Sequence, residues 1–250
     1  MPRIEIAGTT AIVTGASRGF GRAIAGALSG AGVAVVGVAR DGARLDQVRA
    51  DLGDSFTPVP ADAADPFVAA ELIDAHRPDL LVLNAGAVPM ARPVHRQTWE
   101  TFSRNWEVDV KHVFHWTREA LLAPLSPGAT VIAVSSGAAL HGSPQSGGYA
   151  GAKATIRFIA SYARDEAERG GLGIRFVALL PQLTPATDLG AKAVAAYAAR
   201  AGVDVATFLQ ARDPALTTEQ AGNATVDLVT DPGYDQRAYV LTAAGLTPAA

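Results

Sequence analysis

Short apolar runs alternate with helix-like segments along most of the chain, and this alternation restricts the fold more than any other feature. The runs 33–38, 80–83 and 130–134 are nearly continuous in apolar residues, as is typical of parallel strands buried on both faces. Strands that alternate with helical segments predict βαβ units and a parallel sheet. We therefore expect an α/β fold with a doubly wound parallel sheet in three α/β/α layers.

The order of elements can be predicted in some detail. The predicted strands are 10–13, 33–38, 56–60, 80–83, 130–134, 174–180 and 238–242. The predicted helices are 21–29, 41–52, 66–75, 97–122, 149–169 and 218–229, with two short helices within 188–210. No linker, low-complexity tract or solenoid repeat interrupts them, so we expect a single domain over residues 1–250.

The composition excludes several classes of function. Of the 250 residues, 49% are hydrophobic and 18% are charged, which is enough apolar material for a sizeable core. The net charge of −3 gives no general attraction to nucleic acids or anionic membranes. The absence of cysteine excludes disulfides, thiolate nucleophiles and cysteine-ligated metals. Without a signal-peptide core or an apolar run long enough to cross a bilayer, a cytoplasmic protein is expected.

A glycine-rich turn follows the first predicted strand. Residues 14–21 read T-G-A-S-R-G-F-G, with glycines at 15, 19 and 21 that permit a tight turn and close approach of the backbone to phosphates. The helix that follows offers unpaired N–H groups and a partial positive charge to a pyrophosphate. The spacing is G-x-x-x-G-x-G and differs from the G-x-G-x-x-G fingerprint. A strand–helix turn that binds nothing is the alternative.

Tyr149 and Lys153 indicate acid–base chemistry. Residues four apart on a helix share one face, one turn apart, and an ammonium beside a phenol favours the phenolate. That would make the tyrosine a usable general acid–base at neutral pH. Y-x-x-x-K is common by chance, and here its weight comes from the glycine-rich turn and from the pair Ser135-Ser136 upstream. Packing of the helix on the sheet is the alternative role.

These motifs together resemble the short-chain dehydrogenase/reductase family in its single-domain form. The marks are T-G-A-S-R-G-F-G, N-A-G at 84–86, Ser136, Tyr149 and Lys153, and the resemblance extends from Thr10 to about Gly245. Ser136 precedes Tyr149 by thirteen residues, the usual family interval. The resemblance implies a Rossmann fold and an oxidoreductase that transfers a hydride between a nicotinamide dinucleotide and a small ketone or secondary alcohol. A catalytically weak dinucleotide-binding sensor or regulator is the alternative.

The resemblance also implies a role for each matching residue. Tyr149 would protonate the carbonyl oxygen, or take the hydroxyl proton in oxidation, and Ser136 would hydrogen-bond the same oxygen. Lys153 would support Tyr149 electrostatically and bind the nicotinamide ribose. Ser135 is an alternative to Ser136, although neighbours on a strand point to opposite sides. The residues assigned to the cofactor are Gly15, Ser17, Arg18, Gly19, Phe20, Gly21, Arg40, Asp62, Asn84, Ala85, Gly86, Tyr149, Lys153, Pro181 and Thr184.

The end of the second strand indicates NADP(H) more than NAD(H). The position that is usually acidic in NAD-binding relatives falls on Ala39, and Arg40 follows it. Arg18 and Arg40 could clamp a 2′-phosphate with charge-assisted bonds. Alternatively, Arg40 is a solvated loop residue and Asp41 supplies the acidic group. Asp62 resembles the family's adenine-binding aspartate, and a helix N-cap is its alternative role.

Two residues depart from the family pattern. Asp109 stands where the family has an asparagine that helps hold a water passing protons towards the lysine, although an exposed helix position is the alternative. An ionised aspartate accepts but cannot donate a hydrogen bond, and its charge would partly cancel the effect of Lys153 on Tyr149. We expect a working but altered relay with an alkaline-shifted pH optimum, in which Asp109 is one of the catalytic residues. Gln182 replaces the usual glycine after Pro181.

The remaining candidates concern substrate and assembly. Thr184 and Thr187 are both plausible partners of the nicotinamide carboxamide, and residues 188–210 resemble the family's variable substrate lid. His141 follows Ser136 and could line a pocket or lie in a loop. We predict packing or subunit contacts for His112, His115 and Trp116, and no metal site. Relatives often assemble through their long helices, so a homotetramer or homodimer is expected.

Overall fold

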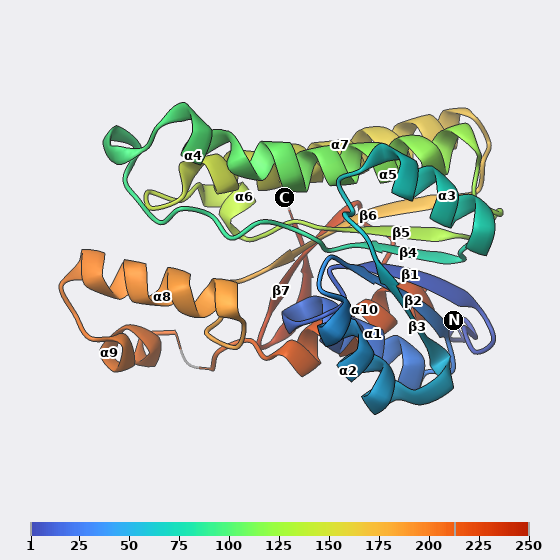
Figure 1. Cartoon of the computed structure of the whole chain (residues 1–250), viewed down its shortest axis with the longest axis horizontal. Helices are drawn as coiled ribbons and strands as arrows, with labels where there is room; N and C mark the ends of the chain where they lie inside the picture. The colour runs from blue at the N-terminus through green and yellow to red at the C-terminus, as the bar shows by residue number, and fades with distance from the viewer. Residues whose placement is uncertain (1, 213, 250) are drawn as a thin grey trace.

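The apolar runs form one eight-stranded sheet with helices on both faces (Figure 1). The computed structural model describes residues 2–212 and 214–249. The strand order is β3-β2-β1-β4-β5-β6-β7-β8; β1 to β7 run parallel and β8 pairs antiparallel with β7. The chain therefore has the α/β Rossmann-like fold that the alternation of elements predicts.

The bounds of most elements lie close to those predicted. The strands are β1 Thr10–Thr14, β2 Ala34–Ala39, β3 Phe56–Pro60, β4 Leu80–Leu83, β5 Thr130–Val134, β6 Arg175–Pro181, β7 Ala238–Thr242 and β8 Gly245–Pro248. The helices are α1 Gly19–Gly30, α2 Gly42–Leu52, α3 Pro66–His76, α4 Trp99–Asn105, α5 Lys111–Leu122, α6 Ala138–His141, α7 Gly147–Arg169, α8 Asp188–Ala201, α9 Val205–Gln210 and α10 Thr218–Thr230. Short 3₁₀ turns cover Gly53–Ser55 and Val94–Arg96.

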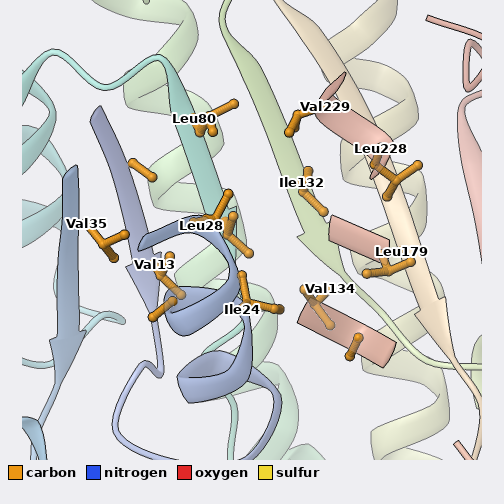
Figure 2. Close-up of a cluster of buried hydrophobic side chains, with 14 of the residues drawn as sticks. Val13, Ile24, Leu28, Val35, Leu80, Ile132, Val134, Leu179, Leu228 and Val229 are labelled. Carbon is orange, nitrogen blue, oxygen red and sulfur yellow. The ribbon is translucent and has the colours of Figure 1, made fainter. Parts of the chain in front are cut away.

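The core lies in two apolar layers, one on each face of the sheet. In β1, Val13 joins the layer beneath α1, α2 and α10, whereas Ile12 joins the layer beneath α3, α5 and α7, as expected where successive side chains point to opposite faces. Figure 1 shows the two sets of helices on either side of the strands. Figure 2 shows part of the first layer, with labelled side chains Val13, Ile24, Leu28, Val35, Leu80, Ile132, Val134, Leu179, Leu228 and Val229.

The predicted helical stretch 97–122 is helical from Trp99 to Leu122, but it is not one regular α-helix. Between α4 and α5 the chain forms five residues of π-helix, Trp106–Val110, in which the hydrogen bonds reach one residue further than in an α-helix. Asp109 lies in this wide turn and is fully buried. π-Turns of this kind occur often at functional sites. The sequence gives no sign of the interruption because every residue in it is compatible with an α-helix.

Two short elements were also not predicted. The four residues Ala138–His141 form the one-turn helix α6 after β5. The four residues Gly245–Pro248 form the edge strand β8. Both lack a periodic pattern long enough to be recognised, and Pro248 reads locally as a strand breaker although it is tolerated at an edge.

The strand order places the site. In the sheet, β2 lies on one side of β1 and β4 lies on the other. The strand order therefore reverses between β1 and β4, which makes this the topological switch point of the sheet. In open α/β sheets, ligands bind in the crevice outside the carboxyl ends of the strands at such a point. The glycine-rich turn after β1 and the N-A-G sequence after β4 both lie at this edge.

Close packing of α7 on α4 generates a stability prediction. A Cβ at Gly148 would overlap the backbone carbonyl of Phe102, whereas a Cβ at Gly151 would lie 3.5 Å from the Trp106 ring, an ordinary contact. We expect Gly148→Ala to lower the free energy of unfolding by about 1–3 kcal/mol, the usual cost of overpacking. Gly151→Ala is the matched control and should gain up to ~1 kcal/mol from helix propensity. Urea unfolding measures the change in the free energy of unfolding for both variants. Equal changes would contradict the close packing of Gly148 on the Phe102 carbonyl.

Candidate active site

The glycine-rich turn is a tight backbone loop that a side chain after the neighbouring strand β4 holds in place. Gly15 and Gly19 have φ of +69° and +55°, in the left-handed region that favours glycine. A Cβ at Gly21 would overlap the Gly15 carbonyl, so the turn closes only with glycine there. The Asn84 side-chain amide donates to the Thr14 carbonyl over 3.0 Å. Asn84 therefore fixes the turn after β1 from the adjacent strand β4.

The N-A-G sequence is fastened to β1 and leaves room for Asp109. The buried Thr14 hydroxyl accepts hydrogen bonds from the Asn84 and Ala85 backbone N–H groups over 2.9 and 3.1 Å. A Cβ at Gly86 would lie 2.8 Å from Asp109 Oδ2. Glycine at position 86 thus allows the carboxylate of the π-turn to reach this loop.

One cavity brings nearly all the predicted site residues together. Its volume is about 1110 Å³, at or above the upper end of the ~300–1,000 Å³ usual for ligand pockets. Gly21 lies behind its wall, packed on Gly15 and Asn84. The predicted residues in the wall are Gly15, Ser17, Arg18, Gly19, Phe20, Arg40, Asp62, Asn84, Ala85, Gly86, Asp109, Ser136, Tyr149, Lys153, Pro181 and Thr184.

The two serines after β5 have different partners. The Ser135 hydroxyl is buried and donates to the Lys153 backbone carbonyl over 2.7 Å. The Ser136 hydroxyl is partly exposed in the cavity wall and accepts from the Ala138 N–H over 3.2 Å. The Ser136 hydroxyl can still donate a hydrogen bond into the cavity. The Ser135 hydroxyl already donates its hydrogen to α7 and helps to hold that helix in place.

Tyr149 and Lys153 lie at the start of α7. The Lys153 ammonium lies 5.6 Å from the centroid of the Tyr149 ring and donates to the Val134 carbonyl over 3.2 Å. Lys153 is 5% exposed and Tyr149 is half-buried. The helix thus presents a phenol to the cavity and an ammonium just behind it.

Asp109 forms a buried ion pair with this lysine. Its Oδ2 lies 3.3 Å from Lys153 Nζ, while its Oδ1 accepts from the Ala87 N–H at 2.7 Å and from the Asn105 side-chain amide at 3.3 Å. The alternative of an exposed helix position is therefore wrong. The charge of Lys153 is partly balanced before any ligand enters the cavity.

His112 lies at the cavity, although the sequence predicts only packing or subunit contacts for it. It is fully buried, yet it lies in the cavity wall together with Asp109 and Lys153. Burial lowers its pKa to about 3, and the nearby Lys153 ammonium acts in the same direction. Trp116 packs as predicted, with its indole N–H bonded to the Ala63 carbonyl over 2.9 Å. The sequence offers no local signal that separates these two helix positions.

At the other end of the cavity, Asp41 is committed to local bonds. Its carboxylate accepts from the Arg44 N–H over 3.1 Å as the N-cap of α2 and pairs with Arg44 Nε at 3.2 Å. Arg40 is exposed in the cavity wall. Arg18 pairs with Asp188 at 2.9 Å, which connects the glycine-rich turn to the start of α8.

Asp62 is not the N-cap of α3. Its Oδ1 accepts from the Ala64 N–H over 3.0 Å in a local turn, whereas Asp65 caps the helix by accepting from the Phe67 N–H over 2.9 Å. Asp62 is exposed in the cavity wall, which leaves its second carboxylate oxygen able to accept from a ligand.

Both candidate threonines hold the segment after β6. The buried Thr184 hydroxyl donates to the Leu216 carbonyl and accepts from the Ala186 N–H, and the Thr187 hydroxyl caps α8 by accepting from the Gly190 N–H over 3.0 Å. Gln182 is exposed at the cavity. The hydrogen bonds give neither threonine a clear advantage as a carboxamide partner.

The segment 188–210 forms two helices beside the cavity, as predicted. Val194, Ala198 and Phe208 make a small apolar cluster between α8 and α9, and the Tyr197 and Phe208 rings stack at 6.3 Å. The Tyr197 hydroxyl is hydrogen-bonded to the Ser143 hydroxyl, which joins α8 to the loop after α6. Figure 1 shows the two helices projecting beside the carboxyl edge of the sheet.

Comparisons with known proteins identify the family and agree with this fold. Residues 9–213 match the family model described as short chain dehydrogenase, so the chain belongs to the short-chain dehydrogenase/reductase family. A protein of Haemophilus influenzae named "Probable NADP-dependent dehydrogenase" is 30% identical over 186 residues, which are 72% of this chain and 73% of that protein.

Two solved structures carry different nicotinamide cofactors. One, from Beutenbergia cavernae and solved with bound NADP at low occupancy, has a TM-score of 0.77 and 29% identity, covering 92% of each chain. The other is a 3-ketoacyl-(acyl-carrier-protein) reductase from Brucella melitensis complexed with NADH. It has a TM-score of 0.73 and 25% identity, covering 92% of this chain and 93% of that one.

Among residues 2–212 and 214–249, no helix is both long and apolar enough to span a membrane. Within the same ranges, no group of three or more histidine, aspartate or glutamate side chains lies together in a way that could hold a metal ion.

The buried ion pair generates a second stability prediction. Asp109→Ala would leave the Lys153 ammonium buried without its counter-charge, and we expect it to lower the free energy of unfolding by about 3–5 kcal/mol. Glu168→Ala is a control on a surface pair, because Glu168 and Arg164 are 2.8 Å apart but the carboxylate is exposed; its cost should be about 1 kcal/mol or less. Denaturant unfolding at neutral pH compares them, and equal losses would contradict the inference.

Proposed function

We propose that the protein is an NADP(H)-dependent oxidoreductase that acts on a small ketone or secondary alcohol. The observation that carries the proposal is that Ser136, Tyr149 and Lys153 share one cavity with the glycine-rich turn. A fold alone supports many functions, but this set of side chains has the chemistry of carbonyl reduction. The similar Brucella melitensis structure is a ketoacyl reductase, which agrees with a carbonyl substrate.

The residues present fit a dinucleotide. Gly15 and Gly19 adopt conformations that bring backbone close to the cavity, and the N-terminus of α1 follows them at the switch point of the sheet. Oriented N–H groups at a helix N-terminus bind phosphates well. The cavity then extends to Tyr149, so the adenosine and nicotinamide ends would have separate walls.

The chain's residues would supply orientation and proton transfer. The bound nicotinamide supplies or accepts the hydride. Ser136 donates a hydrogen bond to the substrate oxygen and holds it beside Tyr149. The Tyr149 hydroxyl gives its proton to that oxygen in reduction and takes one in oxidation. Lys153 holds positive charge behind the phenol and favours the phenolate that proton donation leaves.

The preference for NADP(H) rests on the positions of the charges at the adenosine end. Asp41 is used by α2 and Arg44, so its carboxylate is engaged where a ribose-binding acid would be needed. Arg40 lies exposed in the cavity wall, and Arg18 lies there in its pair with Asp188; both carry the fork geometry that suits a phosphate. The Haemophilus influenzae relative's name and the NADP in the Beutenbergia cavernae structure support this preference, while the NADH in the Brucella melitensis structure weighs against it.

Lid and assembly roles are part of the proposal. The helices α8 and α9 would cover the substrate, with Tyr197 and Phe208 in the cavity wall. Phe114, Phe158 and Tyr162 are large and exposed on α5 and α7, and this outer apolar surface supports a homodimer or homotetramer.

A catalytically weak dinucleotide-binding regulator is the less supported function. The proton donor Tyr149 is present in the cavity wall together with Ser136 and Lys153, so the residues needed for catalysis are in place.

The catalytic role of the phenol can be tested by removing one oxygen. We expect Tyr149→Phe to lower kcat by at least about 100-fold, the low end for loss of a general acid, while the Kd for NADPH changes little. Tyr162→Phe is the matched control on the exposed side of the same helix and should keep full activity. The assay is NADPH oxidation over a panel of ketones and aldehydes. Activity retained by the Tyr149 variant would refute the role.

The cofactor preference can be tested at Arg40. Loss of a charge-assisted hydrogen bond to a 2′-phosphate costs about 1.5–3 kcal/mol, so Arg40→Ala should raise the KM for NADPH about tenfold or more. The KM for NADH serves as the internal control and should stay unchanged. Steady-state kinetics with both cofactors decides the matter. A wild-type preference for NADH would overturn the assignment.

A further inference from the structure

A second, smaller cavity lies next to α8 and adjoins the main one. Its volume is about 20 Å³, which is enough for one group the size of a water molecule, since a water needs ~10–15 Å³. Ser146 precedes α7 directly and lies three residues before Tyr149, so this side chamber is close to the proposed reaction centre. The residues that line both cavities are Val88, Pro89, Ser146, Leu189, Ala193 and Tyr197.

Gln145 lines the side chamber, and its amide is held in one orientation. Its Nε2 donates to the Ala196 carbonyl on α8 over 3.3 Å, and its backbone carbonyl accepts from the Arg92 N–H over 2.7 Å. Because a carbonyl only accepts, the nitrogen end of the amide must face Ala196 and the oxygen end must face away. The Oε1 atom is buried and has no hydrogen-bond partner in the part of the chain that the structure describes. Buried polar atoms nearly always have a partner, so this oxygen indicates a ligand that donates a hydrogen bond.

Three hydroxyl groups in the adjoining wall leave one hydrogen free. The Ser143 hydroxyl is hydrogen-bonded to the Tyr197 hydroxyl and, over 2.7 Å, to the Ser146 hydroxyl, and it accepts from the Ser146 N–H over 3.1 Å. A serine hydroxyl has one hydrogen and two acceptor sites, so Ser143 donates to one of the two hydroxyls and accepts from the other. The hydroxyl that accepts, Ser146 or Tyr197, keeps its own hydrogen, and neither makes a further side-chain hydrogen bond among residues 2–212 and 214–249. One donor is therefore available in the wall that both cavities share.

An acceptor beside a donor suits a hydroxyl group better than a charged group. A hydroxyl can donate to Gln145 Oε1 and accept from Ser146 or Tyr197 at the same time. A carboxylate has no hydrogen for Gln145, and an ammonium has no lone pair for the free hydroxyl hydrogen. The carbon atoms that carry the hydroxyl would contact the apolar part of the wall, which is Val88, Pro89, Leu189 and Ala193.

We propose that Gln145 is a specificity-determining residue that accepts a hydrogen bond from a hydroxyl group of the substrate, so that the preferred substrate is a hydroxy ketone or the corresponding diol. The reacting carbonyl lies beside Ser136 and Tyr149 in the main cavity, and the second oxygen of the substrate enters the side chamber. A substrate without that hydroxyl leaves Oε1 buried and unpaired, and a site built to bind a hydroxyl discriminates against an analogue that lacks it. This proposal rests on the oxidoreductase function proposed above and names its substrate class.

The competing role for Gln145 is to tether α8 through the Ala196 carbonyl, with only a water on Oε1. A tether acts on every substrate alike, whereas a hydroxyl-binding oxygen acts only on substrates that carry the hydroxyl. Each hydroxy ketone is therefore compared with an analogue that has a methyl group in place of the hydroxyl. Effects of a substitution on α8 cancel in the ratio of the two, as in a double-mutant cycle.

The kinetic experiment measures kcat/KM with NADPH for three ketone pairs in the wild type and in Gln145→Met. The pairs are hydroxyacetone and 2-butanone, 4-hydroxy-2-butanone and 2-pentanone, and 5-hydroxy-2-pentanone and 2-hexanone. We expect the wild type to prefer the hydroxy ketone in at least one pair. Methionine keeps the length of the side chain but removes the amide, and it should reduce that preference about tenfold, the order of magnitude that an unsatisfied buried acceptor costs.

Gln220→Met is the matched control for this experiment. Both ends of the Gln220 amide are bonded within the protein, to the Thr217 N–H and to the Ala243 carbonyl, each over 2.9 Å, and Gln220 lines neither cavity. Its substitution should leave the preference for hydroxy ketones as it is in the wild type. A wild type without this preference in any pair, or an equal preference in Gln145→Met, would overturn the proposal.

A binding measurement on the wild type in the presence of NADP⁺ separates this proposal from the proposed function. The side-chain ¹H–¹⁵N signals of Gln145 are followed while each ketone of the three pairs is added. We expect a hydroxy ketone to shift these signals and to bind at least about tenfold more tightly than its methyl analogue. Equal Kd values within every pair would overturn the hydroxyl site and leave water as the partner of Oε1. If the wild type reduces none of the carbonyl compounds, the proposed function fails, and the Kd ratio still decides whether Gln145 binds a hydroxyl.

Discussion

The buried ion pair between Asp109 and Lys153 is the interaction around which the rest of the site is arranged. It joins α7, which carries Tyr149, to the π-turn and, through the Ala87 N–H, to the loop after β4. A buried charge pair costs solvation that only good geometry and further hydrogen bonds can offset. Here the Val134 carbonyl and the Asn105 amide supply those bonds. The three segments therefore hold their relative positions most stably with both charges present.

Small residues make this arrangement possible. Gly86 lets the carboxylate approach the N-A-G loop, and Gly148 lets α7 pack against α4. The π-turn then brings Asp109 and His112 towards the cavity from a helix whose other residues pack on the sheet or face outward. The same contacts that fix the backbone of the site thus also set the charge around Lys153.

Local sequence signals predicted the fold and most of the residues that the structure brings together in one cavity. The parallel sheet follows from apolar runs and helical periodicity, and the glycine-rich turn, Ser136, Tyr149 and Lys153 follow from motifs with fixed spacing. What the sequence could not show depends on contacts between distant segments. The π-turn, the approach of Asp109 to Lys153, the place of His112 in the cavity wall and the pairing of Arg18 with Asp188 all depend on tertiary packing. The edge strand β8 was missed because four residues carry no clear pattern.

The most direct test of this account is the pH dependence of kcat for alcohol oxidation in the wild type and in Asp109→Asn. Asparagine keeps an acceptor for the Ala87 N–H but removes the negative charge that partly cancels the effect of Lys153 on the phenol. Because the uncancelled ammonium stabilises the phenolate more, the rise of activity with pH should move to lower pH in the variant. Superimposable profiles would show that the buried carboxylate does not set the charge of the site, and would contradict the account.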